Sequence, residues 1–120
     1  MSSHFDRKQF NSLIEGDTEL FLTLLQLFEE DWPRIMSSLD KAISQKNLKQ
    51  IEQMAHRIKG NLRNFYAIDA AAVALAIEEA GRENKLNGIE EQVAQLKIAI
   101  EQVQKDLRDF YKEVTANKKS

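Results

Sequence analysis

One histidine surrounded by cations is the clearest chemical feature of this sequence. The stretch MAHRIKGNLRNFY spans residues 54–66 and holds His56, Arg57, Lys59, Gly60 and Arg63. An imidazole can act as a base or a nucleophile near neutral pH, so His56 is the first candidate for chemistry. A glycine inside a helix costs about 1 kcal/mol relative to alanine, so Gly60 also needs a reason.

The apolar residues around His56 predict a helix that turns the imidazole outward. They recur at helical spacing at Leu48, Ile51, Ala55, Ile58, Leu62 and Phe65. At about 100° per residue, their common direction lies roughly 130° away from His56. The residues within about 60° of the imidazole are Glu52, Gln53, Lys59, Gly60 and Arg63. We therefore expect His56 on an exposed face, and not as a buried structural histidine.

Gly60 favours a function for this exposed histidine. It lies one turn after His56 on the outward face, where a missing side chain does not help core packing. The space above Gly60, beside His56 and within reach of Lys59, would admit a tetrahedral anion attached to the imidazole. A lysine ammonium can screen such an anion as a mobile point charge. The pattern favours a histidine that carries a phosphoryl group, with an exposed histidine of no function as the alternative.

Other chemistries are not favoured by the sequence. A di-iron or di-manganese bundle needs Glu-x-x-His pairs from two helices, whereas Gln53 stands three residues before His56. Glu52 and His56 could supply two metal ligands, which is too few for a site. No P-loop or glycine-rich phosphate loop is present, so phosphorylation of the chain by its own use of ATP is not expected.

Composition favours a single all-helical domain. The chain has 120 residues, of which 42% are apolar and 30% charged, with four glycines and one proline. So few turn residues argue against a fold of many strands. The absence of cysteine suits a cytoplasmic protein, and a net charge of −2 gives no general attraction to nucleic acid. Because neither a secretory signal nor an apolar run of about 18 residues is found, we expect no membrane association.

Helix signals divide the first half of the chain into two helical segments. We expect Asp6 to cap a short helix that ends at Gly16 and Asp17 to cap the next one. The inward residues expected there are Phe10, Leu13, Ile14, Leu20, Phe21, Leu24, Leu25, Phe28, Ile35, Met36, Leu39, Ala42 and Ile43. Pro33 predicts a kink or a fresh helix start near Trp32, because proline donates no hydrogen bond and its ring meets the carbonyl of Glu29.

Three more helices complete the expected fold. Asn47 resembles a cap for the helix that carries His56, and Asp69 is a candidate cap for the fourth helix. After a break at Asn87-Gly88, the last helix has an apolar seam at Ile89, Val93, Leu96, Ile100, Val103, Leu107 and Phe110. Short connections make neighbouring helices antiparallel, so we expect an up-down-up-down four-helix bundle with a short extra N-terminal helix.

The expected helices also set the extent of the domain. We expect one domain over residues 1–120, with residues 1–5 and 115–120 flexible and a frayed tail from Thr115. A monomer is the default. The last seam could also form a coiled-coil dimer, but the other helices need that surface to complete their core.

The segment Ala55-His56-Arg57-Ile58-Lys59-Gly60 resembles the A-H-x-[LI]-K-G signature of histidine-containing phosphotransfer (HPt) domains, which are the single-histidine bundles of multistep phosphorelays. The preceding run FLTLLQLFEEDWPRIMSSLDKAISQKN is similar to the helices before the signature in that family. Downstream, AIEEA resembles the family's L-E-x-A segment. The resemblance therefore extends across most of the chain.

This resemblance implies a phosphohistidine carrier that is not itself an enzyme. His56 would accept a phosphoryl group through Nε2 from a receiver-domain phosphoaspartate and pass it to another receiver aspartate. Lys59 would be the cation beside the phosphoryl group and Gly60 would provide clearance. Glu78 falls where the family often places a polar residue that hydrogen-bonds the other ring nitrogen, and Glu52 competes for that role by its spacing. No cofactor is expected, since Mg²⁺ belongs to the receiver.

The resemblance also implies partners for this chain, and two positions depart from the family pattern. Receiver domains are the expected partners and a hybrid sensor histidine kinase is a candidate partner. The residues expected to contact them are Gln53, Arg57, Arg63 and Asn64. Arg63 stands where the family usually has a small residue, and Tyr66 stands where it usually has glycine, which is expected to affect the helix end. Two alternatives stay open: a helical adaptor that is not phosphorylated, and the phosphoacceptor module of a chemotaxis-type kinase.

Overall fold

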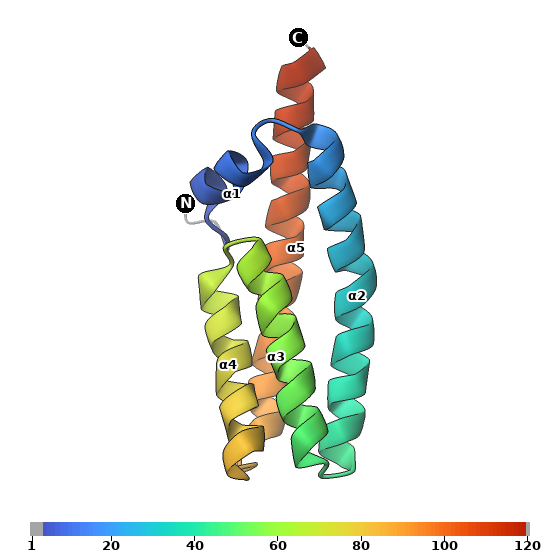
Figure 1. The fold of residues 1–120 in the computed structure, drawn as a ribbon, viewed down its shortest axis with the longest axis vertical. Coiled ribbons are helices and arrows are strands. Elements are labelled where there is room, and N and C mark those ends of the chain that lie inside the picture. Colours follow the sequence, from blue (N-terminus) through green and yellow to red (C-terminus); the bar gives the residue numbers. More distant parts are fainter. Residues whose placement is uncertain (1–3, 120) are drawn as a thin grey trace.

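Four long helices lie antiparallel, and a short fifth one lies above the upper ends of two of them while the other two extend past it (Figure 1). The structure is a computed structural model that describes residues 4–119, with side chains described to residue 116. Its helices are α1 (Arg7–Ile14), α2 (Thr18–Ser44), α3 (Leu48–Asn64), α4 (Ile68–Glu83) and α5 (Ile89–Lys119). The molecule measures 53 × 25 × 19 Å and has no strand within residues 4–119. The expected all-α bundle with an extra N-terminal helix is confirmed.

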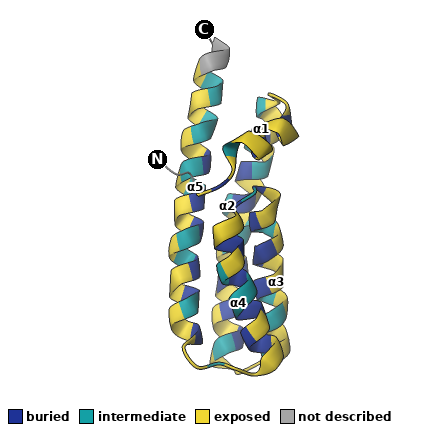
Figure 2. Ribbon diagram, turned by 90° about the vertical axis from the view of Figure 1, so that its left-hand side faces the viewer, coloured by how far each residue is buried: buried dark blue, intermediate teal, exposed yellow. Residues whose placement is uncertain are grey.

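The apolar seam of α5 is buried inside the bundle. The buried positions are Ile89, Val93, Leu96, Ile100, Val103 and Leu107, as the seam predicted, and they form one stripe along the helix (Figure 2). This face of α5 packs against α2 and α4 of the same chain. The seam is therefore used to close the bundle and is not left for a second copy. None of the helices in the described part of the chain is both long and apolar enough to cross a membrane.

All six phenylalanines of the sequence belong to one network of contacting rings at the end where α1 crosses. With Tyr111, the members are Phe5, Phe10, Phe21, Phe28, Phe65 and Phe110. Aromatic side chains bury large apolar areas and pack edge to face. Because the network draws on α1, α2, α5 and the end of α3, it fixes α1 on the bundle.

Residues near both chain ends make contacts within the fold. Phe5 is only 4% exposed because it packs against Phe10 and Phe110. At the other end, helix α5 continues through Thr115, whose hydroxyl donates to the carbonyl of Tyr111, and ends at Lys119. The flexibility expected of residues 1–5 and 115–120 stays a prediction. Residues 1–3 and 120 lie outside the described part of the chain.

The expected helix caps are confirmed except for one. Asp6, Asp17 and Asn47 each accept a hydrogen bond from the backbone N–H three residues later. Asp69 is not a cap, because α4 begins at Ile68 with Ala67 as its N-cap and no side-chain hydrogen bond. Asp69 lies in the first turn instead, where a carboxylate still interacts favourably with the positive end of the helix dipole.

Pro33 does not interrupt α2. The helix runs from Thr18 to Ser44 without a fresh start at Trp32. Pro33 is exposed, so solvent can satisfy the carbonyl that loses its partner. Three side-chain pairs also hold α2 against α5 on both sides of the proline, Glu29 with Arg108, Trp32 with Gln104 and Asp40 with Lys97.

Two leucines expected in the core are exposed. Leu13 on α1 is 51% exposed and Leu20 on α2 is 39% exposed. The helical period placed both near the apolar stripe, but the packing of α1 against α2 does not cover these two side chains. At the end of α3, Tyr66 takes a left-handed conformation with φ of 58°. Glycine adopts this conformation more easily, so the tyrosine marks the helix end as expected and adds backbone strain there.

Candidate functional site

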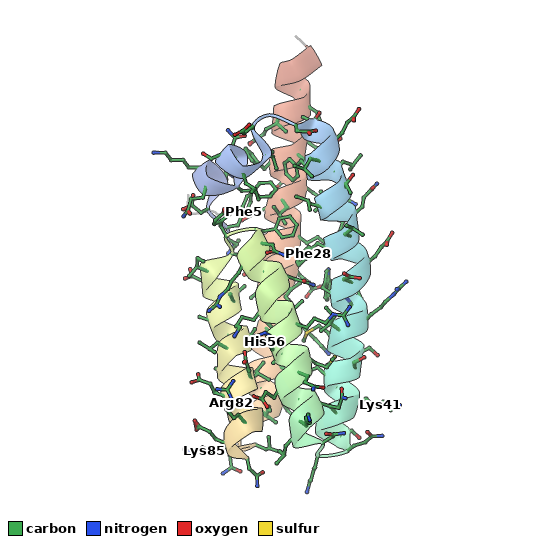
Figure 3. All side chains as sticks on the ribbon, in the orientation of Figure 1. Phe5, Phe28, Lys41, His56, Arg82 and Lys85 are labelled. Carbon is green, nitrogen blue, oxygen red and sulfur yellow. The ribbon has the colours of Figure 1, made fainter. Side chains whose placement is uncertain are left out.

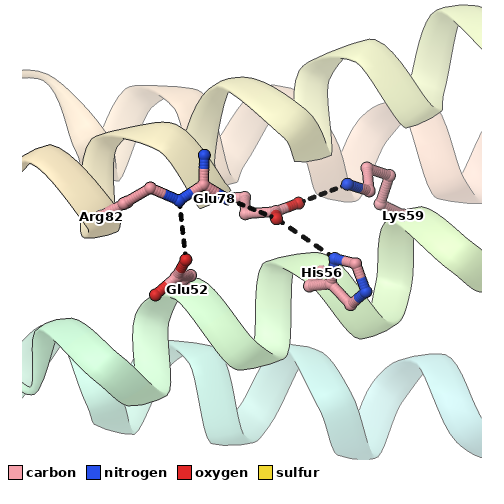
Figure 4. A network of polar contacts seen from close by, with 5 residues as sticks. All are labelled: Glu52, His56, Lys59, Glu78 and Arg82. Carbon is pink, nitrogen blue, oxygen red and sulfur yellow. Dashed lines mark hydrogen bonds and ion pairs between the residues drawn. The ribbon is translucent and has the colours of Figure 1, made fainter.

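His56 stands on the outer surface of α3, about midway along the bundle (Figure 3). Its side chain is 68% exposed, as the helical period predicted. One ring nitrogen, Nδ1, lies 3.1 Å from Oε2 of Glu78 on the neighbouring helix α4. The other ring nitrogen, Nε2, points away from this carboxylate (Figure 4). The histidine is therefore held at one nitrogen and open at the other.

Glu78 is a buried carboxylate with cationic partners on both oxygens. Its side chain is only 5% exposed. Oε1 lies 2.6 Å from Nζ of Lys59 and forms an ion pair with it, but the two atoms are not aligned for a hydrogen bond. Oε2 accepts a hydrogen bond of 2.8 Å from Nη2 of Arg82, in addition to its contact with His56. These contacts make Glu78 the centre of the polar network drawn in Figure 4.

The charge state of Glu78 decides which imidazole nitrogen carries the proton. Burial raises the pKa of Glu78, but its contacts with Lys59 and His56 outweigh burial and hold that pKa below its ordinary value. Glu78 is therefore ionised at neutral pH and can only accept hydrogen bonds. In neutral His56 the proton must then lie on Nδ1, which leaves the lone pair on the exposed Nε2.

The side chain of Lys59 lies in a different place from the one that the sequence predicted. The helical period put it on the outward face as a mobile cation, whereas its side chain is only 9% exposed and its ammonium is held by Glu78. Lys59 stands at the edge of that face, toward α4, and α4 packs closely enough to cover it. A lysine covered in this way extends its apolar stem along the interface and needs a carboxylate at its end.

Glu52 does not contact the histidine ring. Its carboxylate accepts a hydrogen bond of 2.8 Å from Nε of Arg82. Arg82 thus bridges Glu52 on α3 and Glu78 on α4, and of the two candidates Glu78 is the one at Nδ1. Arg82 was not predicted from the sequence, although it stands four residues after Glu78, a spacing that brings two side chains together on a helix.

Two glycines near the site have opposite surroundings. A Cβ added to Gly60 would meet nothing within 4 Å, which agrees with the open space predicted beside His56. A Cβ added to Gly81 on α4 would come within 3.0 Å of Ile51 Cγ2 and of the backbone nitrogen of Glu52. Gly81 therefore allows α4 to approach α3 and bring Glu78 under His56. The sequence analysis did not single it out.

The residues expected to contact partners are all exposed. Gln53, Arg57, Arg63 and Asn64 lie on α3 on both sides of His56 along the helix. Gln53 also lines a shallow hollow with Glu52, His56 and Glu78. No group of three metal-binding side chains is found in the part of the chain that the structure describes.

An apolar groove lies toward the α1 end of this surface. It has a volume of about 280 Å³ and is lined by Leu13, Leu24, Leu27, Phe28, Asp31, Asn61, Asn64 and Phe65. Leu13 and Leu27 are 51% and 52% exposed, so the groove presents apolar surface to solvent. Asn64 belongs both to the groove and to the exposed face of α3. The sequence analysis missed this groove because it assigned Leu13 to the core.

Comparisons with known proteins agree with this geometry. The family model for the Hpt domain matches residues 23–106 of the chain. Among solved structures, histidine-containing phosphotransfer protein B (HptB) from Pseudomonas aeruginosa PAO1 is similar, with a TM-score of 0.86 and 22% identity. The match covers 94% of this chain and 98% of that one, and at this identity it concerns the fold. A search of curated proteins gave no match.

Proposed function

The chain belongs to the Hpt domain family, whose members carry phosphoryl groups on histidine in phosphorelays, and from this premise we propose that His56 is its phosphoacceptor. It accepts a phosphoryl group from the phosphoaspartate of one receiver domain and passes it to an aspartate of another. The observation that carries this proposal is the state of the imidazole. Its Nδ1 is held by an ionised carboxylate and its Nε2 is exposed, beside the open space at Gly60.

The transfer step needs no proton to enter or leave. The lone pair of Nε2 attacks phosphorus while the bond from phosphorus to the aspartate oxygen breaks, and the aspartate leaves as a carboxylate. The proton stays on Nδ1, so the phosphorylated ring is a cation. Glu78, 3.1 Å from Nδ1, faces this cation and stabilises it. The reverse step passes the phosphoryl group on to the second receiver.

In this proposal the chain is a carrier and not a kinase. Phosphoryl transfer depends mainly on positioning and on electrostatic stabilisation of the transferred group. The receiver supplies the aspartate and its Mg²⁺, and a hybrid sensor histidine kinase is a candidate source of the receiver that donates. This chain then needs to supply only His56 and the residues that orient it, Glu78 and Lys59. We also propose a monomer, because the apolar seam of α5 is buried within its own bundle.

We further propose that the receiver covers the apolar groove as well as His56. A standard protein interface buries about 800 Å² on each partner, which corresponds to a disc about 16 Å in radius. Asn64, at the edge of the groove, follows His56 by eight residues, or about 12 Å along the helix. A receiver centred on Nε2 therefore reaches Asn64 at the edge of the groove, and the exposed side chains of Leu13 and Leu27 in the same groove offer it apolar contact.

The test is incubation with a phosphorylated receiver. We expect the wild-type protein to gain a phosphate that is labile in acid and stable in base, and His56→Gln to gain none. His4→Gln is the matched control, since His4 is the second histidine of the chain and should be dispensable. Equal labelling of wild type and His56→Gln would refute the assignment.

Two other outcomes would point to other functions. Tight binding of the receiver without any transfer would indicate an adaptor that blocks its partner. Labelling of His56 by a separate ATP-dependent kinase domain, with none from phosphorylated receivers, would indicate the phosphoacceptor module of a chemotaxis-type kinase.

A further inference from the structure

The two cations nearest to His56 are already bound to carboxylates. Lys59 Nζ lies 2.6 Å from Glu78, and Arg82 is held between Glu52 and Glu78. Each of the two positive charges is matched by a negative charge within the same network. A phosphoryl group on Nε2 carries about two negative charges at neutral pH. The network around Nδ1 therefore leaves little positive charge for the phosphoryl group.

Arg63 is placed to supply that charge. It follows His56 by seven residues, so the two residues share a face of α3 to within about 20°. Seven residues span about 10 Å of helix, and long helical side chains lean toward the N-terminal end, which here is the direction of His56. Between the two residues lies Gly60, where nothing would meet an added Cβ within 4 Å. No side chain at position 60 therefore stands between Arg63 and the imidazole.

The guanidinium of Arg63 is also uncommitted. The residue is exposed and makes no ion pair with any other residue among those that the structure describes. Arg57 is also exposed, but it lies about 100° around the helix from His56. Of these two arginines, Arg63 alone combines a free guanidinium with the direction of Nε2.

We propose that Arg63, and not Lys59, is the residue of this chain that binds the phosphoryl group on His56. This inference rests on the proposed function of His56. A planar guanidinium can donate two parallel hydrogen bonds to phosphoryl oxygens, which suits a tetrahedral anion held over Gly60. Lys59 has a different role, since it neutralises the buried Glu78 that orients the ring.

The test loads His56 without a receiver. Phosphoramidate donates its phosphoryl group to an imidazole nitrogen and releases ammonia, so the phosphorylated protein can be prepared directly. The second ionisation of the attached phosphoryl group is then followed against pH by its ³¹P chemical shift. We expect Arg63→Gln to raise that pKa by on the order of half a unit, because a nearby cation favours the dianion. Arg63→Lys should restore most of the difference.

Arg57→Gln is the matched control and should leave the ionisation unchanged. An unchanged ionisation in Arg63→Gln would overturn the inference while leaving the phosphoacceptor role of His56 intact. If the wild-type protein forms no phosphohistidine at position 56, the proposed function falls and this inference falls with it. The measurement does not need transfer from receivers. A failure of that transfer would therefore count against the proposed relay and not against the role of Arg63.

Discussion

Lys59 on α3 and Glu78 on α4 form an ion pair over 2.6 Å, in which the side chains are only 9% and 5% exposed. The pair lies beneath an exposed histidine that shares the same carboxylate. A buried carboxylate without a cation would be protonated or strongly destabilising. Lys59 therefore keeps Glu78 charged, and the charged Glu78 fixes the proton of His56 on Nδ1.

Replacing Glu78 with glutamine should destabilise the fold by about 3 kcal/mol, because the change leaves the ammonium of Lys59 buried without a counter-ion. Unfolding in urea, followed through the fluorescence of Trp32, measures the free energy directly. Trp32 is the single tryptophan of the chain and is partly buried against α5. The double variant Glu78→Gln/Lys59→Met should recover part of the loss. Equal stability of the wild type and Glu78→Gln would show that the pair is not a stabilising unit.

Acid should weaken the same interaction. The pKa of Glu78 lies below its ordinary value of 4.5, so the charged carboxylate stabilises the folded state above that value. This stabilisation is lost as pH falls through the lowered pKa. The difference in unfolding free energy between wild type and Glu78→Gln should therefore shrink as pH falls below 4.5. A difference that did not change on acidification would contradict the assigned charge state.

The two helical glycines near the site should respond to alanine in opposite ways. Gly60→Ala should stabilise the protein by about 0.5–1 kcal/mol, because the added methyl meets nothing and removes the helix penalty of glycine. Gly81→Ala should destabilise it by about 1–3 kcal/mol, because its methyl would press on Ile51 and on the backbone of Glu52. Thermal unfolding of both variants is the measurement. A loss of stability in Gly60→Ala would mean that Gly60 serves packing.

This contrast shows what one sequence could and could not predict. The outward direction of His56 and the open space at Gly60 depend only on the period of α3, which the apolar residues of that helix record. The burial of Lys59 and the contact at Gly81 depend on how closely α4 approaches α3. That distance is set by two helices together, so a pattern read along one of them does not contain it.

The dependence of packing on more than one helix also explains other differences between the predicted and the observed structure. The seam of α5 was predicted well because it repeats regularly over about five turns from Ile89 to Leu107, and only Phe110 at its end is partly buried. Leu13 was assigned to the core because it follows the period of α1, yet the other helices bury Phe10 and Ile14 of α1 and leave Leu13 51% exposed. The groove that results belongs to no single helix. Arg82 was missed because its two carboxylate partners lie on different helices.

Filling the space at Gly60 should impair transfer more than it affects folding. Gly60→Leu places a bulky side chain beside Nε2, where the phosphoryl group and the receiver must both fit. We expect the rate of transfer from a phosphorylated receiver to fall on the order of a hundredfold, as misplacing a reacting group typically does. Stability should not fall, because position 60 is open in the folded protein. Unimpaired transfer in a folded Gly60→Leu protein would remove the clearance role.

The apolar groove should contribute to receiver affinity without contributing to the chemical step. Leu27→Ser removes an exposed leucine from the groove, and we expect the KM for the phosphorylated receiver to rise about fivefold, as the loss of about 1 kcal/mol of apolar contact predicts. The rate at saturating receiver should stay unchanged, since Leu27 lines the groove and is not part of the polar network that holds His56. Ile98→Ser is the matched control, because Ile98 on α5 is 57% exposed against 52% for Leu27 and lies outside the groove. Equal effects of the two serine variants, or an effect of Leu27→Ser on the saturated rate alone, would show that the receiver does not dock on the groove.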